Sequence, residues 1–308
     1  MVFEASKDYL REFKGNKIVV AKYLAFLAGS VLSLPFRKLA SFFNFSEKRY
    51  NELIRGKDEI IMPVLGSKMI LPTKDQGLSR EIFLHGIREA NAVEVMKKEV
   101  TLGMNIIDAG ANIGYYVLLE SQKANKVYAL EPNPNSFRIL KRNVQLNKRK
   151  NVLLKNIAVG DKIGTISFVL DESWNLSRVL KPGEKISNGK INKVKIKTLD
   201  NLFNGKRIDL IRMDVEGYEL NILQGAVNLI KSNPKIKIFL EFHADMFNPK
   251  RREDFINFCK QNNLRIKHFF HKEAKVDKPY SKNFSYLRNS KLTAYHLMLD
   301  VIPNAKNN

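Results

Sequence analysis

The chain has 308 residues, 44% of them hydrophobic, which is enough for a sizeable core and excludes a disordered protein. The single cysteine, Cys259, excludes a disulfide framework within the chain and fits a reducing, cytoplasmic compartment. Lys and Arg number 53 against 31 Asp and Glu, so the formal net charge is +22. Such an excess either serves solubility or attracts an anionic partner: a nucleic acid, an acidic membrane or an acidic glycan.

Residues 1–60 are predicted to form a helical N-terminal extension, and residues 61–308 a single α/β domain. The segment 18–36 is the most apolar part of the chain, but it contains Lys22 and is short for a transmembrane helix. Basic residues flank this segment on both sides, as in a helix that lies on an acidic membrane surface. A core helix of an N-terminal cap is the alternative. We expect a cytoplasmic protein, either free or bound peripherally to the cytoplasmic face of the membrane.

Residues 60–71 alternate apolar and polar side chains around Pro63 and Gly66, which predicts a short hairpin, and residues 79–100 are predicted as one helix. From residue 104 onward, short apolar strands alternate with helical segments, which favours a parallel sheet covered on both faces. The expected strands are 104–107, 126–130, 152–157, 208–213 and 236–241, and the expected helices are one ending at 122, then 136–146, 219–231 and 251–261. Two further strands, 264–270 and 293–299, are expected to form an antiparallel pair at the sheet edge.

The stretch NIIDAGANIGYY, residues 105–116, places a glycine-containing turn between a predicted strand and a predicted helix. In an open α/β sheet, ligands bind beyond the carboxyl ends of the strands, where this turn lies. Gly110 would allow a tight turn and the approach of a ligand to the backbone, and Gly114 would let the helix pack close to the strand. Asn112 stands where such a pattern usually has its middle glycine, and asparagine tolerates left-handed torsion angles.

An acid at the end of the second predicted strand, Glu131, lies 23 residues after Asp108 and is suited to accept hydrogen bonds from two ribose hydroxyls. This pairing fits either NAD or S-adenosylmethionine. Two tyrosines follow Gly114, where a dinucleotide needs a third glycine beside its pyrophosphate. After the third strand, Ala158 suits an adenine ring lying on the backbone, with the Asp161 carboxylate near its exocyclic amine. These residues favour S-adenosylmethionine, and an NAD-linked oxidoreductase is the alternative.

Five stretches resemble the FkbM-type S-adenosylmethionine-dependent methyltransferases: DAGANIGYY, ALEPNPNSF, NIAVGD, KTLDNL and IRMDVEGYELNILQGA. The resemblance implies a Rossmann-like class I methyltransferase fold, a mostly parallel, doubly wound sheet with an antiparallel C-terminal edge pair. It also implies transfer of a methyl group to a hydroxyl oxygen of a sugar, a polyketide or another small natural product. By the same resemblance, contacts to S-adenosylmethionine fall on Asp108, Gly110, Asn112, Gly114, Glu131, Ala158 and Asp161.

The fourth predicted strand ends in Asp214-Val-Glu216, and the fifth ends in Glu241-Phe-His243. Side chains alternate along a strand, so Asp214 and Glu216 would lie on one side. Asp214 is expected beside the sulfonium end of the cofactor, where it holds the methionine ammonium or orients the acceptor. His243 or Glu216 is predicted to be the general base, with Glu241 as a further candidate. A metal held by Asp214, Glu216 and His243 is an alternative, but we expect none because no dedicated ligand spacing is present.

Trp174, Asn175 and Arg178 are predicted to line the acceptor pocket, because Trp stacks on sugar faces and the two polar side chains offer directional hydrogen bonds. A mobile polar loop is expected at 181–193 and would close over the site. The expected acceptor is a sugar or glycan, either free or lipid-linked. An RNA 2′-hydroxyl methyltransferase is another alternative, although DVEG stands where nucleic-acid base methyltransferases often have an Asn/Asp-Pro-Pro-aromatic motif.

Overall fold

The computed structural model describes residues 50–52, 54–171, 177–180, 184, 186, 189–243, 246–271, 284, 287–288 and 294–302. The chain divides into two compact units, residues 1–88 and 89–308. The apolar segment 18–36 lies outside the described residues, as do Trp174 and Asn175. Within the described part of the chain, none of the helices has both the length and the apolar character needed to span a bilayer.

The described part of the first unit contains helical residues at 50–52 and 54, a β-hairpin and helix α4. Strands β1 (Glu59–Val64) and β2 (Ser67–Pro72) pair in antiparallel fashion, which confirms the predicted hairpin. The two turn residues, Leu65 and Gly66, both have positive φ angles, as the favoured two-residue hairpin turns require. Helix α4 (Leu78–His85) begins after Asp75, whose carboxylate accepts the N–H groups of residues 77 and 79.

The single helix predicted at 79–100 is wrong, because the chain forms two helices there. Helix α4 ends at Gly86, which has a φ of 73°. The N–H of Gly86 donates to the carbonyl of Ile82. Helix α5 (Ala90–Glu99) begins after Glu89, whose φ of 52° is also left-handed. A left-handed residue cannot continue a right-handed helix, so these two positions separate the helices.

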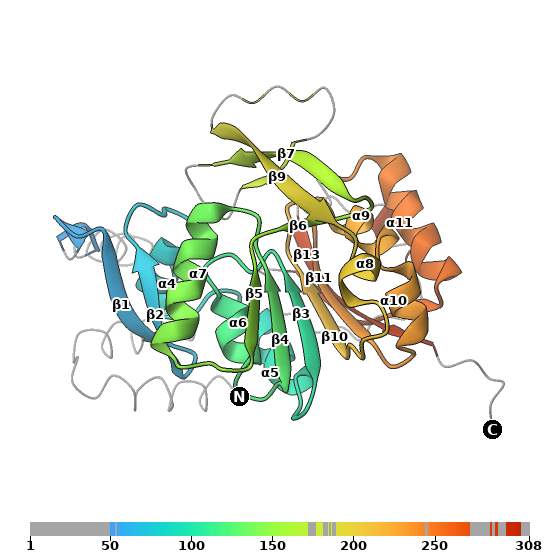
Figure 1. Ribbon diagram of the computed structural model, residues 1–308, viewed down its shortest axis with the longest axis horizontal. Coiled ribbons are helices and arrows are strands. Elements are labelled where there is room, and N and C mark those ends of the chain that lie inside the picture. The colour runs from blue at the N-terminus through green and yellow to red at the C-terminus, as the bar shows by residue number, and fades with distance from the viewer. Residues whose placement is uncertain are drawn as a thin grey trace, which may run out of the picture. The chain divides into compact units, whose positions relative to one another are not determined.

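The second unit is built on a seven-stranded sheet with the order β12-β13-β11-β10-β3-β4-β5 (Figure 1). These strands are β3 (Asn105–Ala109), β4 (Lys126–Leu130), β5 (Val152–Lys155), β10 (Leu210–Met213), β11 (Lys237–His243), β12 (Leu264–His271) and β13 (Ala294–Val301). Strands β5, β4, β3, β10 and β11 run parallel to one another, and β13 is antiparallel to both β11 and β12. The predicted class I fold, with its antiparallel C-terminal pair, is therefore confirmed.

The strand order reverses between β3 and β10. From β3 the chain moves outward through β4 and β5, and it then returns to place β10 on the other side of β3. Ligands of open α/β sheets bind beyond the carboxyl ends of the strands at such a reversal. The glycine turn after β3 and the DVEG segment after β10 both lie at this point.

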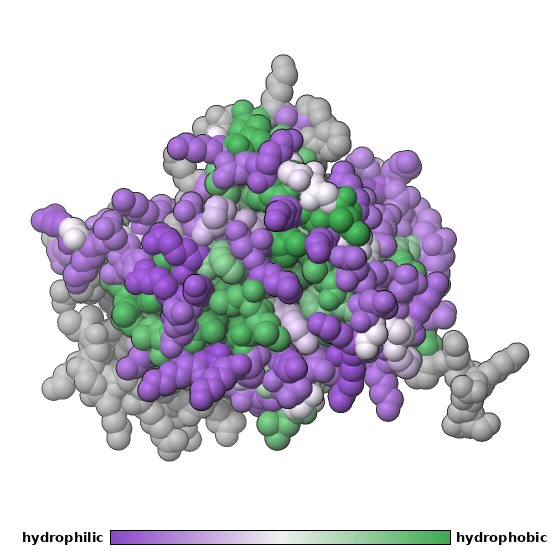
Figure 2. All heavy atoms as spheres, in the orientation of Figure 1, coloured by the Kyte–Doolittle hydropathy of each residue, from purple (hydrophilic) through white to green (hydrophobic). Residues whose placement is uncertain are grey.

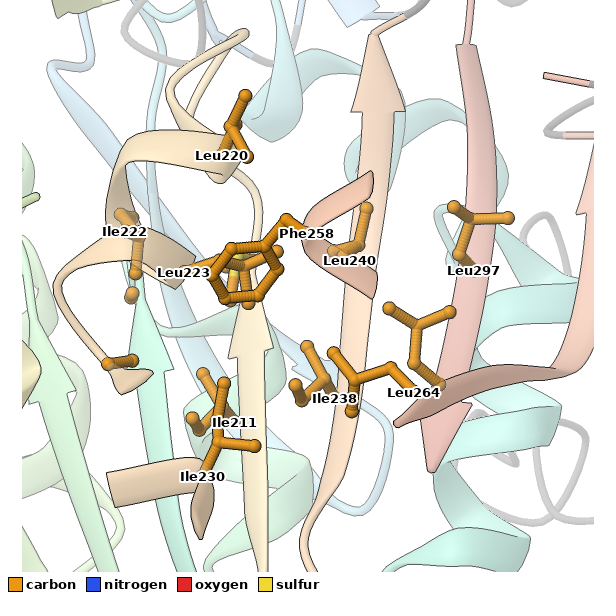
Figure 3. Packing of buried hydrophobic residues seen from close by; sticks show 14 of the residues in the cluster. Ile211, Leu220, Ile222, Leu223, Ile230, Ile238, Leu240, Phe258, Leu264 and Leu297 are labelled. Carbon is orange, nitrogen blue, oxygen red and sulfur yellow. The ribbon is translucent and has the colours of Figure 1, made fainter. Parts of the chain in front are cut away.

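The largest buried cluster lies between the main sheet and helices α8 (Leu199–Phe203), α9 (Glu219–Gln224), α10 (Val227–Ser232) and α11 (Pro249–Gln261). Figure 3 shows Ile211, Ile238 and Leu240 of the sheet close to Leu223 and Phe258 of the helices. The single helix predicted at 219–231 is wrong, because α9 and α10 are separate. Gly225, between them, packs so closely that an added Cβ would lie 1.9 Å from the carbonyl oxygen of Gly160.

A second, four-stranded sheet has the order β6-β9-β7-β8 and was not predicted. Its strands are β6 (Ala158–Val159), β7 (Gly164–Leu170), β8 (Arg178–Val179) and β9 (Lys190–Lys197). The loop predicted at 181–193 is therefore wrong at its C-terminal end, because Lys190 already belongs to β9. Only two residues separate the end of β5 from the start of β6, so this small sheet starts beyond the carboxyl end of β5 (Figure 1).

The surface is mostly polar, as the excess of lysine leads one to expect. Figure 2 shows that hydrophilic side chains cover most of the visible face, with apolar areas nearer its centre. Exposed large apolar side chains do occur among the described residues, and Leu102 and Ile163 are examples with exposures of 84% and 62%. Scattered apolar residues of this kind are normal on a folded protein.

The substitution Leu223→Ala is expected to lower the free energy of unfolding by about 2–5 kcal/mol, because it removes apolar contacts and leaves a cavity. Leu223 is fully buried in the cluster between sheet and helices. Urea denaturation followed by circular dichroism measures the loss. The matched control is Leu102→Ala, which removes the same atoms from an exposed side chain and should change little. Equal losses in the two variants would contradict the position of Leu223 in the core.

Candidate active site

The turn after β3 is shaped by residues with positive φ angles, and each has a steric reason. Gly110 has a φ of 77°, and an added Cβ would lie 2.2 Å from the carbonyl oxygen of Asp214. Gly114 has a φ of 96°, and an added Cβ would lie 2.8 Å from the Leu140 side chain of helix α7 (Pro134–Leu146). Asn112, at a φ of 47°, takes the left-handed conformation predicted for it. The first glycine therefore lets the loops after β3 and β10 touch each other.

Glu131 connects the loops after β3 and β4. Its carboxylate accepts the N–H of Asn112 at 2.8 Å and the N–H of Asn133 at 2.7 Å. Burial raises the pKa of Glu131 to about 7, although these two backbone hydrogen bonds act to lower it. The loop after β5 is joined to the loop after β4 as well, because the side-chain amide of Asn156 donates to the carbonyl oxygens of Glu131 and Pro132. The ends of three neighbouring parallel strands are thus joined around one buried acid.

Arg212 is a buried cation between two of the predicted site residues. The β3–β10 register places it directly beside Asp108. Its guanidinium contacts the Asp108 carboxylate at 3.0 Å and the Asp214 carboxylate at 3.2 Å, and it lies 4.2 Å from the centroid of the Tyr116 ring. Burial acts to lower the pKa of Arg212, but the two carboxylates outweigh it and raise this pKa further. Arg212 therefore remains charged and holds the two acids in place.

Several buried acceptor atoms near Arg212 have no hydrogen-bond partner within the described residues. They include Asp108 Oδ2, Asn112 Oδ1 and both carboxylate oxygens of Glu120. Burial, reinforced by the negative charge of Asp108, raises the pKa of Glu120 well above its usual range. A buried acceptor without a partner is costly, so donors or positive charge from a ligand would be favourable here.

A second group of acids surrounds His243 at the end of β11. The His243 Nδ1 atom lies 3.1 Å from Glu219 Oε1, and its Nε2 atom lies 3.4 Å from Glu216 and 3.8 Å from Glu241. Burial acts to lower the pKa of His243, but the hydrogen bond to Glu219 and the three carboxylate charges raise it to about 11. Burial also raises the pKa of Glu216 to about 8, against the opposing charge of His243. The carboxylates around His243 therefore favour its protonated, imidazolium form.

Glu241 links this group to a third set of buried side chains. The β11–β13 register places Glu241 opposite His296, and His296 Nε2 lies 3.4 Å from Glu89 Oε2. Glu89 in turn accepts a hydrogen bond of 3.0 Å from the hydroxyl of Tyr116, the ring that stacks on Arg212. Burial raises the pKa of Glu241, and the negative charge of Asp214 adds to this effect. The acids at the ends of β3, β10 and β11 thus form one continuous network.

The remaining predicted site residues that the structure describes follow β5 in the chain. Ala158 lies in β6 of the small sheet, where it pairs with Ile196. Asp161 is exposed, and its carboxylate accepts hydrogen bonds from Tyr218 at 3.3 Å and Asn221 at 3.1 Å. Arg178 lies in β8 and forms an ion pair with Glu184.

Sequence reasoning missed three residues that hold the site together: Arg212, Glu219 and Asn156. Arg212 is a charged residue inside an otherwise apolar strand, which is itself a signal that it pairs with a buried acid. Glu219, fully buried, directly follows the DVEGY stretch at the start of α9. Asn156 gave no signal in the sequence, because its role depends on the backbone of the neighbouring loop.

Comparison with known proteins identifies similar chains. A family model described as the methyltransferase FkbM domain matches residues 108–272. The hexuronic acid methyltransferase AglP of Haloferax volcanii is 28% identical over 160 residues, which cover 51% of this chain and 63% of that protein. Methyltransferase sdnD of Sordaria araneosa is 29% identical over 153 residues, which cover 39% of this chain and 59% of that protein. The chain thus spans about three fifths of the length of these curated relatives.

Solved structures with a related fold are more distant in sequence. The methyltransferase FkbM from Methylobacillus flagellatus KT is 15% identical with a TM-score of 0.40, over 70% of this chain and 55% of that chain. Trm5b from Pyrococcus abyssi is 16% identical with a TM-score of 0.44, over 79% of this chain and 55% of that chain.

The substitution Arg212→Met should destabilise the protein by about 3–5 kcal/mol, because it leaves two buried carboxylates without their cation. Chemical denaturation at neutral pH measures this loss. Arg288→Met is the matched control, because Arg288 forms a similar ion pair with Glu253 on the surface, where both side chains are more than 40% exposed. The control should leave stability nearly unchanged, since exposed pairs contribute little. An Arg212 variant as stable as the control would contradict the described ion pairs.

Proposed function

The chain belongs to the FkbM methyltransferase family, and we propose that it transfers the methyl group of S-adenosylmethionine to a hydroxyl oxygen of an acidic sugar. The observation that supports this most directly is the acid-rich, buried network at the point where the strand order of the main sheet reverses. S-adenosylmethionine carries a sulfonium and an ammonium group, so a site rich in carboxylates is complementary to it.

The residues present fit this cofactor. The carboxylate of Glu131 uses its two backbone hydrogen bonds to fix its position and retains lone pairs for two ribose hydroxyls. The unpartnered oxygens of Asp108 and Asn112 offer acceptors to hydroxyl and ammonium donors. Asp214 is partly exposed, with 23% of its side chain accessible, and Arg212 holds its carboxylate in place. These four side chains come from the ends of β3, β4 and β10.

When bound, S-adenosylmethionine supplies a methyl group that is already activated for displacement by an oxygen nucleophile. The chain's own contribution is to align the acceptor, exclude water and receive the hydroxyl proton. The carboxylates around His243 raise its pKa, so without a bound cation the protonated ring acts as a hydrogen-bond donor. In their ionised form, the carboxylates beside it, Glu216 and Glu241, receive the proton, because their raised pKa values make them stronger bases than ordinary surface acids.

Two observations support an acidic sugar as the acceptor. One relative is a hexuronic acid methyltransferase. The net charge of +22 would favour the approach of an anionic glycan, whether free or attached to a lipid at a membrane surface. The acidic network is buried, whereas most of the basic residues lie outside it, so the methyl donor and the acceptor would be attracted by different parts of the protein.

Binding of S-adenosylmethionine should be about tenfold tighter at pH 8 than at pH 6, because Glu131 ionises with a pKa of about 7 and its carboxylate accepts the ribose hydroxyls better when charged. Calorimetric titration at several pH values measures this slope. The variant Glu131→Gln should bind more weakly and lose most of the pH dependence. NAD, titrated in parallel, should show no saturable binding. Identical slopes in the two proteins would remove Glu131 from the proposed cofactor site.

The acceptor is tested by supplying methyl-labelled S-adenosylmethionine with an oligosaccharide that contains hexuronic acid, its neutral counterpart, or RNA. Label should enter the acidic sugar and resist mild alkali, because a methyl ether survives conditions that cleave a methyl ester. Alkali-labile product would place the methyl group on the carboxyl group and contradict transfer to a hydroxyl. Preferential labelling of the neutral sugar or of RNA would contradict the acidic acceptor.

A further inference from the structure

We propose that Asp214, Glu216 and His243 bind one divalent transition-metal cation. Each of the three side chains offers one ligand atom, and these atoms all lie within 4.8 Å of one another. The residues stand at the ends of two neighbouring parallel strands, β10 and β11, so the main sheet brings them together. The binding of the cation is inferred from this geometry alone. A catalytic role for the cation rests, in addition, on the proposed methyl transfer.

The orientation of His243 is that of a metal ligand backed by a carboxylate. Its Nδ1 atom is fixed at 3.1 Å by Glu219, a fully buried acid at the start of α9. Metal-binding histidines usually donate their second ring nitrogen to such a carboxylate, which sets the tautomer and the direction of the ring. Glu219 also accepts the N–H of Gly217 through the same oxygen, so it is itself held in place.

The other ring nitrogen of His243 points into the space between the acids. Its distances of 3.4 Å to Glu216 and 3.8 Å to Glu241 exceed those of an ordinary hydrogen bond. The His243 side chain is only 9% exposed, so water has little access to it as a hydrogen-bond partner. Within the described residues, this nitrogen therefore faces two carboxylates at distances longer than that of a normal hydrogen bond.

The charge around this nitrogen also favours a cation. Four carboxylates surround the ring, those of Asp214, Glu216, Glu219 and Glu241. The nearby cation Arg212 pairs with one of them, but it is shared with Asp108. Burial of several like charges is costly unless positive charge compensates them. A divalent cation bound among these carboxylates would supply this charge.

The ligand set selects the kind of metal. One imidazole nitrogen with two carboxylate oxygens suits a divalent first-row transition metal such as Mn²⁺ better than Ca²⁺, which prefers oxygen ligands alone. Three protein ligands leave further positions for an acceptor oxygen. Such a cation would lower the pKa of an acceptor hydroxyl bound to it. The hydroxyl proton would pass to a neighbouring carboxylate, the oxygen would form the bond to the methyl carbon, and the electron pair of the broken carbon–sulfur bond would stay on sulfur.

The test uses the full chain, freed of metals with a chelator and then titrated with Mn²⁺ alone. Electron paramagnetic resonance should show one bound Mn²⁺ per chain, and spin-echo measurements on the wild type should show coupling to an imidazole nitrogen. His243→Gln and Glu216→Gln should lose the site, and Glu219→Gln should weaken it by about tenfold or more. The matched control is His296→Gln, from the adjacent buried group of Glu89 and Glu241, which should leave Mn²⁺ affinity unchanged.

The outcomes separate this inference from the proposed function. No stoichiometric Mn²⁺ binding, no nitrogen coupling, or a site lost in His296→Gln instead of His243→Gln would each overturn the metal site. Because the wild-type measurement needs neither S-adenosylmethionine nor an acceptor, tight Mn²⁺ binding without methyl transfer would overturn the proposed function and leave the metal site standing. Circular dichroism of each variant shows that a lost site reflects a lost ligand and not a lost fold.

Discussion

The arrangement of this protein depends on the neutralisation of buried carboxylates. Asp108 is fully buried next to apolar strand residues, and it is tolerated there because the β3–β10 register places Arg212 beside it. The same guanidinium holds Asp214 and stacks on Tyr116, so one cation fixes the loops after two strands and the start of α6 (Tyr115–Glu120). Without Arg212, the low dielectric of the interior would force these acids to take up protons or to separate.

Strand alternation explains how an ionic network and a large apolar core share the same sheet. Ile211 and Met213 of β10, with Ile107 and Ala109 of β3, join the buried cluster beneath α8 to α11. Arg212 and Asp108 stand between them in sequence and therefore project to the opposite face. The opposite face also buries apolar side chains such as Ile106 and Leu210, but it is this face and the carboxyl ends of the strands that hold the charges.

Much of this was readable from the sequence, because it depends on local pattern. The apolar strands, the glycine turn at Gly110 and the acid at Glu131 follow from periodicity and spacing. The breaks at Gly86 and Gly225 were missed because helical periodicity continues across them while the backbone does not. The small sheet was missed because KINKVKIK looks polar, although its residues pair with β7 throughout. Of the partners of His243, only Glu241 lies on the same strand, while Glu216 and Glu219 come from the segment after β10, so no local pattern predicts how strongly its pKa is raised.

The small sheet has a further consequence for how such a chain can change over time. It is inserted between β5 and β10, and only the two residues of β6 follow the main sheet closely. Lengthening or shortening the hairpins within 164–197 would change the stability of the parallel sheet little, because the entropic cost of closing a loop depends only weakly on its length. Related chains could therefore differ in the size of the small sheet while they keep the same main sheet. The close contact between Gly160 and Gly225, where no side chain fits, is a position that such changes would have to leave intact.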